Sequence, residues 1–131
     1  MSEAERLIEE VIRDTEQPVV VFALEWCEFC HSLRKMLQEL GITFCSVDLD
    51  SDAYREGGLG RQIRLALTEK TGVATIPQVF VGGEFVGGCT DVVAAYQYGE
   101  LQALLDACGA DYKKGFDLDF TKFLPGWLHP R

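Results

Sequence analysis

The feature that most constrains this chain is an apolar stretch that runs directly into two closely spaced cysteines. Residues 19–24 form a short apolar run rich in β-branched side chains, a composition typical of a buried strand. A Cys-x-x-Cys motif, Cys27 and Cys30, follows almost at once, and apolar residues at helical spacing come next. The pattern predicts a strand-to-helix corner that presents two thiols.

The placement of these thiols indicates reactivity. At the first turn of a helix, unpaired backbone N–H groups and the positive end of the helix dipole favour a thiolate at Cys27. Cys30 lies one turn further on, within disulfide reach. A redox-active pair is therefore favoured, but Cys-x-x-Cys is also half of a zinc site, and buried cysteines can simply fill a core. No other Cys-x-x-Cys, Cys-x-His or His-x-x-x-His pair occurs in the chain.

Size and charge limit the remaining options. A chain of 131 residues is expected to form one domain with a core of its own. A formal net charge of −9 argues against nucleic acid or an anionic membrane as the principal partner. The charged N-terminus, the absence of a run long enough to cross a bilayer, and the odd number of cysteines, five, favour a reducing, cytoplasmic location.

The first half of the chain predicts two parallel strands joined by a helix. Ser2 and Glu5 form a capping box for an N-terminal helix that should end near Pro18. After the strand at 19–24, a helix is expected to begin near Cys27 and to stop at Gly41. Residues 42–48 alternate as a second strand, and a helical crossover between two strands implies parallel pairing.

The second half predicts a helix, a hairpin and a further helical region. The helix should span residues 59–70. Residues 78–81 and 84–86 flank a Gly-Gly turn, the strongest hairpin signal in the chain. Helical sequence then continues to about residue 109, with a break expected near Gly99.

Two further stretches have the composition of binding elements. In Thr75-Ile76-Pro77, a proline stands directly before a strand, where a cis peptide bond would expose the backbone of Ile76 to an extended peptide. In residues 87–91, two glycines precede a helix, and free N–H groups at a helix start can hold a carboxylate. Either stretch could also be purely structural.

Together, the motifs at residues 27–30, 75–83 and 87–91 resemble those of the glutaredoxins, a family within the thioredoxin fold. The likeness extends from about residue 18 to residue 109. It implies an α/β, thioredoxin-like domain over residues 1–109, with a four-stranded mixed sheet in the order 2-1-3-4 flanked by helices. Residues 110–131 would form a C-terminal extension that packs on the domain or docks a partner.

The resemblance to dithiol glutaredoxins also implies an activity. The protein would be a monomeric, glutathione-dependent thiol–disulfide oxidoreductase that reduces protein–glutathione mixed disulfides and protein disulfides. Cys27 would be the nucleophile and Cys30 the resolving thiol, with glutathione as cosubstrate and no required metal. The residues that the resemblance assigns to glutathione binding are Trp26, Phe29, Arg64, Thr75, Ile76, Pro77, Gly88, Cys89 and Thr90.

The sequence departs from the family pattern at three points that affect this predicted activity. Leu24 stands where the family usually has a lysine, and Glu25 and Glu28 add negative charge, so activation of Cys27 should be weaker than usual. Glu28 also replaces a proline. With Trp26 before the nucleophile, this resembles members that assemble a [2Fe–2S] cluster between two subunits, through Cys27 and bound glutathione. A cluster carrier is therefore the alternative function.

The third departure is the extension itself, whose residues 116–128 are more apolar than a disordered tail normally is. A thioredoxin-like reductase supplied by a flavoenzyme fits less well, because the glycine-rich stretch and Arg64 suit glutathione. His31, Arg34 and Lys35 are nearby cations whose directions the sequence does not fix. Cys45 and Cys108 are expected to be packing residues.

Overall fold

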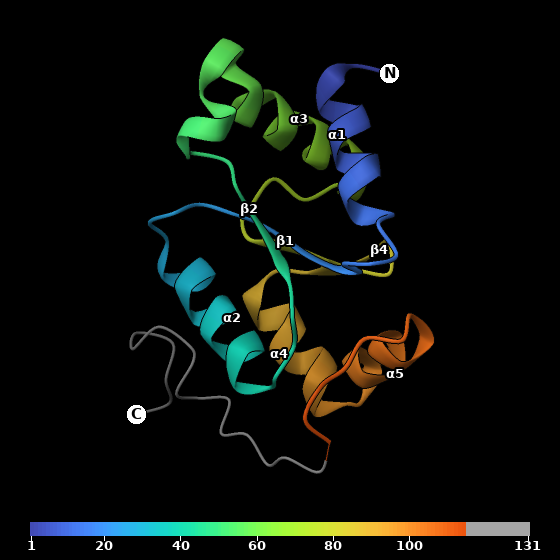
Figure 1. The fold of residues 1–131 in the computed structure, drawn as a ribbon. Coiled ribbons are helices and arrows are strands. Elements are labelled where there is room, and N and C mark those ends of the chain that lie inside the picture. Colours follow the sequence, from blue (N-terminus) through green and yellow to red (C-terminus); the bar gives the residue numbers. More distant parts are fainter. Residues whose placement is uncertain (115–131) are drawn as a thin grey trace.

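The sheet is organised around β1 (Val19–Ala23), a strand that is buried over its whole length. The computed structural model describes residues 1–114, in which helices cover both faces of a four-stranded sheet (Figure 1). The helices are α1 (Glu3–Ile12), α2 (Glu28–Glu39), α3 (Leu59–Thr71), α4 (Cys89–Gln97) and α5 (Glu100–Ala107), with short 3-10 turns η1 (Asp52–Tyr54) and η2 (Glu56–Gly58). The other strands are β2 (Cys45–Asp48), β3 (Gln78–Val81) and β4 (Glu84–Gly87).

The strand order is β2-β1-β3-β4, which confirms the predicted mixed sheet of thioredoxin type. Val20 of β1 pairs with Cys45 of the parallel β2 and with Phe80 of the antiparallel β3. The β3–β4 hairpin turns at Gly82 and Gly83, whose φ angles of 59° and 86° are readily adopted by glycine. The two-residue glycine turn is therefore a requirement of the hairpin geometry.

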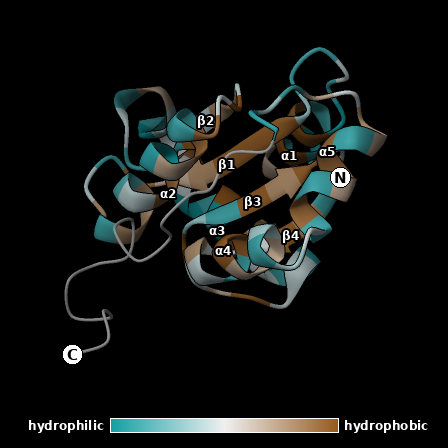
Figure 2. Ribbon diagram, turned by 90° about the horizontal axis from the view of Figure 1, so that it is seen from below, coloured by the Kyte–Doolittle hydropathy of each residue, from teal (hydrophilic) through white to brown (hydrophobic). Residues whose placement is uncertain are grey.

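The side chains of β1 alternate between two cores, which explains its continuous apolar run. Val19 and Val21 point toward the layer of α2, α4 and α5, whereas Val20 and Phe22 point toward α1 and α3. Figure 2 shows β1 and β3 as hydrophobic strands between the helices. In the α1/α3 core, Phe22 packs edge-on against Phe80, with ring centroids 5.7 Å apart.

Two predicted elements are shorter than expected. Helix α1 is capped by Ser2 and Glu5 as predicted, but it ends at Ile12 instead of near Pro18. Its apolar stripe ends there, and the Asp14 carboxylate accepts the Glu16 N–H in a local turn that competes with the helix.

Strand β2 covers residues 45–48 of the predicted 42–48. The N–H of Ile42 donates to the Leu37 carbonyl, so the chain is still closing the end of α2 at that point. Gly41 takes a φ of 69°, as a helix stop requires. The predicted break at residues 98–99 is confirmed, since α4 and α5 are separate helices.

The first residues of the C-terminal extension lie against the domain. The Lys113 N–H donates to the Leu40 carbonyl at 2.7 Å, the Tyr112 hydroxyl donates to Asp106 at 3.0 Å, and Ala110 packs on the core. Residues 115–131 lie outside the described part of the chain, and so does the prediction made for most of the extension. Within residues 1–114, no helix has the length and apolar character that a membrane span needs.

Phe80 tests the α1/α3 core. It is 1% exposed and contacts both Phe22 and Phe85. Phe80→Ala should lower the free energy of unfolding by about 3–5 kcal/mol, because it leaves a cavity between the sheet and the helices. Urea unfolding measures this loss, with Tyr98→Ala as a control at an exposed position. A loss at Phe80 as small as the one at Tyr98 would contradict this description of the core.

Candidate functional site

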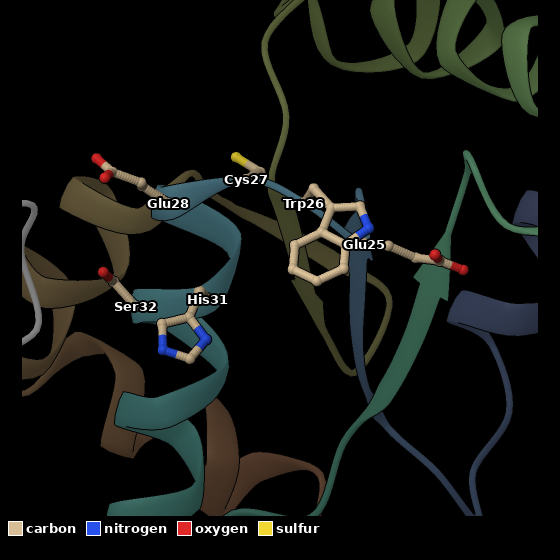
Figure 3. Close-up of a pocket in the computed structure, with 6 residues that line it drawn as sticks. All are labelled: Glu25, Trp26, Cys27, Glu28, His31 and Ser32. Carbon is tan, nitrogen blue, oxygen red and sulfur yellow. The ribbon is translucent and has the colours of Figure 1, made fainter.

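Cys27 is the N-cap residue of α2, at the corner where β1 ends. Its backbone is extended, its carbonyl accepts the His31 N–H at 2.9 Å, and its side chain is half-buried. Figure 3 shows its sulfur above the first turn of the helix. The sulfur thus lies where the unpaired N–H groups of a helix start favour a negative charge.

Cys30 has a different environment, although it is only one helical turn away. It is 0% exposed, and its sulfur accepts the Leu24 N–H at 3.5 Å. Burial raises the pKa of the Cys30 thiol, so this group stays protonated at neutral pH. Cys27 is therefore the accessible thiol of the pair, and Cys30 is the protected one.

The loop between β1 and α2 is held from two sides. The Arg34 guanidinium donates to the Leu24 and Glu25 carbonyls at 3.4–3.5 Å and pairs with Asp48 at 3.4 Å. From the other side, Asp50 accepts the Glu25 N–H at 2.8 Å. These hydrogen bonds fix the chain immediately before Cys27. They also show that Arg34, noted in the sequence only as a nearby cation, supports the loop.

The Ile76–Pro77 peptide bond is cis, and Pro77 is buried beside the start of β3. Within residues 1–114, neither the N–H nor the C=O of Ile76 has a hydrogen-bond partner. The Ile76 side chain packs against the same core as Cys27. A free backbone donor and acceptor are therefore available for an extended ligand.

Gln78 supports this segment and was not identified from the sequence. It is the one polar residue that is buried in the described chain, at 1% exposure. Its amide donates to the Val73 and Thr75 carbonyls at 2.7 and 3.1 Å. The sequence feature that could have indicated its role is a glutamine directly after a proline in an otherwise apolar strand. The amide satisfies the carbonyls of the loop that leads into Pro77.

The glycine-rich turn lies against Pro77. A Cβ atom at Gly88 would lie 3.4 Å from the Pro77 carbonyl oxygen, so the two backbones are in close contact. The Gly88 N–H donates to Asp91 at 2.9 Å. At Gly87, φ is 132° and a Cβ would collide with the Asp91 side chain, which explains the glycine. The start of α4 is thus fixed beside the proline loop.

Cys89 begins α4 and is 3% exposed. Burial, and secondarily the charge of Cys27, raise the pKa of the Cys89 thiol to about 11. The second cause places Cys89 within electrostatic range of the nucleophile, and both residues pack in the same core cluster. The structure therefore brings Cys27, the proline loop and the glycine-rich turn together.

The other predicted site residues are exposed or only partly buried. Arg64 is exposed on α3, and its guanidinium has no partner among residues 1–114. Thr75 and Thr90 are exposed, and Phe29 packs partly on the core. Trp26 is 89% exposed.

Trp26 contributes to a pocket of about 480 Å³ beside Cys27 (Figure 3). The residues that line this pocket are Glu25, Trp26, Cys27, Glu28, His31 and Ser32. Except for Cys27 and Trp26, none of the residues predicted for the active site borders it. Cys27 is thus reached from two sides, by the pocket and by the proline and glycine-rich segments.

Comparisons with known proteins agree with this geometry. The family model described as Glutaredoxin matches residues 19–86. The chain is 39% identical over 93 residues to Glutaredoxin-C6 of Oryza sativa subsp. japonica, covering 71% of this chain and 79% of that protein. It is 42% identical over 93 residues to a glutaredoxin of Solanum lycopersicum, covering 71% and 82%.

The chain belongs to the glutaredoxin family. Among solved structures, the buckwheat glutaredoxin–glutathione complex superposes with a TM-score of 0.72 at 33% identity, covering 82% of this chain and 91% of that one. As a glutaredoxin, the protein is a thiol–disulfide oxidoreductase with the thioredoxin fold. Family membership favours the redox interpretation of Cys27 and Cys30 over a zinc half-site or inert cysteines. Within the described residues, no group of three or more His, Cys, Asp or Glu side chains could hold a metal ion.

A substitution at Arg34 tests the contacts that hold the loop between β1 and α2. Arg34→Lys should accelerate amide hydrogen exchange at Glu25, because the compact ammonium lacks the planar fork with which the guanidinium spans two carbonyls and a carboxylate. Mass spectrometry with peptide-level resolution measures the exchange. Arg13→Lys, which alters an exposed ion pair with Glu9, is the matched control. Unchanged exchange at Glu25 would show that Arg34 does not hold the loop.

Cys89 allows a test of pH dependence. An ordinary thiol ionises near pH 9.0, whereas the folded Cys89 has a pKa of about 11, so between these values the folded state binds more protons than the unfolded chain. Stability should therefore fall as pH rises above about 9, and Cys89→Ala should remove this contribution. Under reducing conditions, raising the pH from 8 to 10 lowers the free energy of unfolding, and this loss should be about 1 kcal/mol smaller in Cys89→Ala than in the wild type. Equal losses in the two proteins would refute the raised pKa of Cys89.

Proposed function

We propose that this protein is a glutathione-dependent oxidoreductase that reduces protein–glutathione mixed disulfides and, through Cys30, protein disulfides. The observation that carries the proposal is the convergence of three segments on one sulfur. Cys27 stands at a helix start, with the free backbone of Ile76 and the glycine-rich start of α4 close to it. A γ-linked tripeptide with two carboxylates and an extended backbone offers partners for the free backbone and for the helix start.

In the proposed reaction, the Cys27 thiolate attacks the glutathionyl sulfur of a mixed disulfide. The Cys27–glutathione disulfide forms, the old disulfide breaks, and the protein thiol leaves with a proton from solvent. A second glutathione then attacks the bound glutathionyl sulfur, releasing oxidised glutathione and the Cys27 thiolate. Two electrons move in each exchange, so no prosthetic group is needed.

Protein disulfides require the second thiol. Cys27 attacks one sulfur of the target, which gives a mixed disulfide between the two proteins. Cys30 then loses its proton, attacks the Cys27 sulfur and releases the reduced target. The high pKa of Cys30 keeps it inactive until that stage, because only its thiolate is nucleophilic.

The proposed glutathione contacts follow the geometry. Ile76 would pair main chain to main chain with the cysteinyl part of the ligand beside Pro77. Gly88, Cys89 and Thr90 would receive the γ-glutamyl carboxylate at the start of α4, a site that favours an anion. The buckwheat relative was solved as a glutathione complex, which supports this ligand.

The contacts of Trp26, Phe29, Arg64 and Thr75 with glutathione stay predictions, because their side chains lie at the edge of the convergent group or beyond it. The alternative, a [2Fe–2S] carrier, rests on Glu28 and Trp26 alone, and the comparisons do not add support for it. The proposed location is a reducing compartment such as the cytoplasm, because an odd number of cysteines, five, does not suit a disulfide framework.

The two thiols can be separated by mutation. Cys27→Ser should reduce both activities to background, because it removes the nucleophile. Cys30→Ser should retain release of glutathione from a glutathionylated protein and lose reduction of a protein disulfide. A coupled assay with glutathione, glutathione reductase and NADPH measures both reactions.

Cys45→Ser is the control, because Cys45 lies on β2 and packs in the α1/α3 core, away from the nucleophile. It should retain both activities. Full activity in Cys27→Ser, or no turnover of any glutathionylated substrate by the wild type, would reject the proposed function.

A further inference from the structure

The pocket beside Cys27 is a second approach to the nucleophile, separate from the proline and glycine-rich segments. It is formed by consecutive residues around the start of α2, and Cys27 itself is part of its wall. Any disulfide that reacts with Cys27 must bring two groups to that sulfur, one on each side of the bond under attack. The protein thus has one surface for each half of a disulfide substrate.

The chemistry of this pocket is acidic and aromatic. Glu25 and Glu28 are exposed, and Figure 3 shows them on opposite sides of the Cys27 sulfur and the Trp26 ring. Trp26 is 89% exposed, although tryptophan has the largest apolar surface of any side chain. No lysine or arginine is among the residues that line the pocket.

Residues around the pocket add further negative charge. Asp50 is exposed and accepts the Glu25 N–H, which adds a third carboxylate beside the loop. The Arg34 guanidinium is directed to the Leu24 and Glu25 carbonyls and pairs with Asp48, so another carboxylate offsets its charge. Lys35 is exposed on α2 but does not line the pocket.

We propose that this pocket, defined by Glu25, Trp26, Glu28 and His31, is the binding site for the polypeptide half of the substrate, and that it selects segments carrying lysine or arginine next to the reacting cysteine. An exposed indole face attracts a cation, most effectively the guanidinium of arginine. Flanking carboxylates attract the same group and speed its approach. The proposal deepens the proposed function by naming its substrate class.

The test measures the first attack alone, with no glutathione present. Three peptides of equal length carry a single cysteine as a mixed disulfide with 2-thiopyridine, flanked by arginine, by glutamine or by glutamate. The Cys27 thiolate attacks the peptide sulfur, the Cys27–peptide disulfide forms, and pyridine-2-thione leaves and is measured by absorbance. The rate of Cys27→Ser with each peptide is subtracted, which removes the contribution of the other cysteines.

The full-length wild type should react with the arginine peptide about tenfold faster than with the glutamate peptide at low ionic strength. The ratio should shrink toward one at about 0.5 M salt, where exposed charges are screened. Glu25→Gln/Glu28→Gln should reduce the ratio at least threefold in low salt. Because the ratio compares two peptides on one protein, it is unaffected by a change in the intrinsic reactivity of Cys27.

Glu10→Gln/Glu84→Gln is the matched control, since it removes the same charge from exposed positions on α1 and at the far end of the β3–β4 hairpin. It should retain the wild-type ratio. Trp26→Ala should reduce the reaction rate with the arginine peptide more than the rate with the glutamine peptide.

Two results would overturn the proposal: equal rates with the arginine and glutamate peptides, or an equal loss of selectivity in both double variants, which would attribute it to net charge. If the protein did not depend on glutathione, these rates would be unchanged, because the assay contains no glutathione. The proposed function and the proposed peptide selectivity can therefore be refuted independently.

Discussion

The structure depends on the antiparallel pairing of β1 with β3. Phe22 pairs with Gln78 across this ladder, so the end of β1 and the beginning of β3 lie at the same edge of the sheet. Because β4 returns antiparallel to β3, Gly87 pairs with Val79 at that edge as well. The segments around residues 27, 76 and 88 are thereby joined, and each contributes a different part of the site: a thiol, a free backbone and a helix start.

The same edge explains why the two cysteines differ. A strand buried on both faces must leave the core where the sheet ends, and α2 begins at that exit with Cys27 half-buried. One turn later the helix has returned to the core, and Cys30 is fully buried. Helical geometry alone thus converts a spacing of three residues into a substrate-facing thiol and a protected one. Burial is the main cause that raises the pKa of the Cys30 thiol, and this needs no dedicated acid or base.

Local patterns in the sequence were sufficient for most of the fold. The apolar run at β1, the glycine turn of the hairpin and the capping box of α1 each depend on residues within a few positions of one another, and each was predicted. The ends of α1 and β2 were predicted less well. There, Asp14 and Ile42 form hydrogen bonds that compete with the regular element, and periodicity does not record such competition.

The supporting groups of the site, Arg34 and Gln78, were the hardest to predict, and for Arg34 the reason is the distance of its partners in the sequence. Arg34 acts on carbonyls ten residues away and on Asp48 from another strand, so nothing in its own neighbourhood distinguishes it from a solvated arginine. Gln78 was at least marked by its position in an apolar strand. The motifs thus indicate where chemistry is presented, whereas the residues that hold those motifs in place are evident only after the chain has folded.

The acidic residues around Cys27 have two opposed effects. Glu25 and Glu28 repel a developing thiolate and any anionic ligand, which offsets part of the stabilisation by the helix start. The same charges attract a cationic segment of a protein substrate, and they do so before contact is made. In the proposed function, glutathione would meet the sulfur from the side of Pro77 and Gly88, where the amide groups of α4 favour an anion. Two separate approaches would let one sulfur accept ligands of opposite charge, so the acidic departures from the family pattern would become the basis of substrate selectivity.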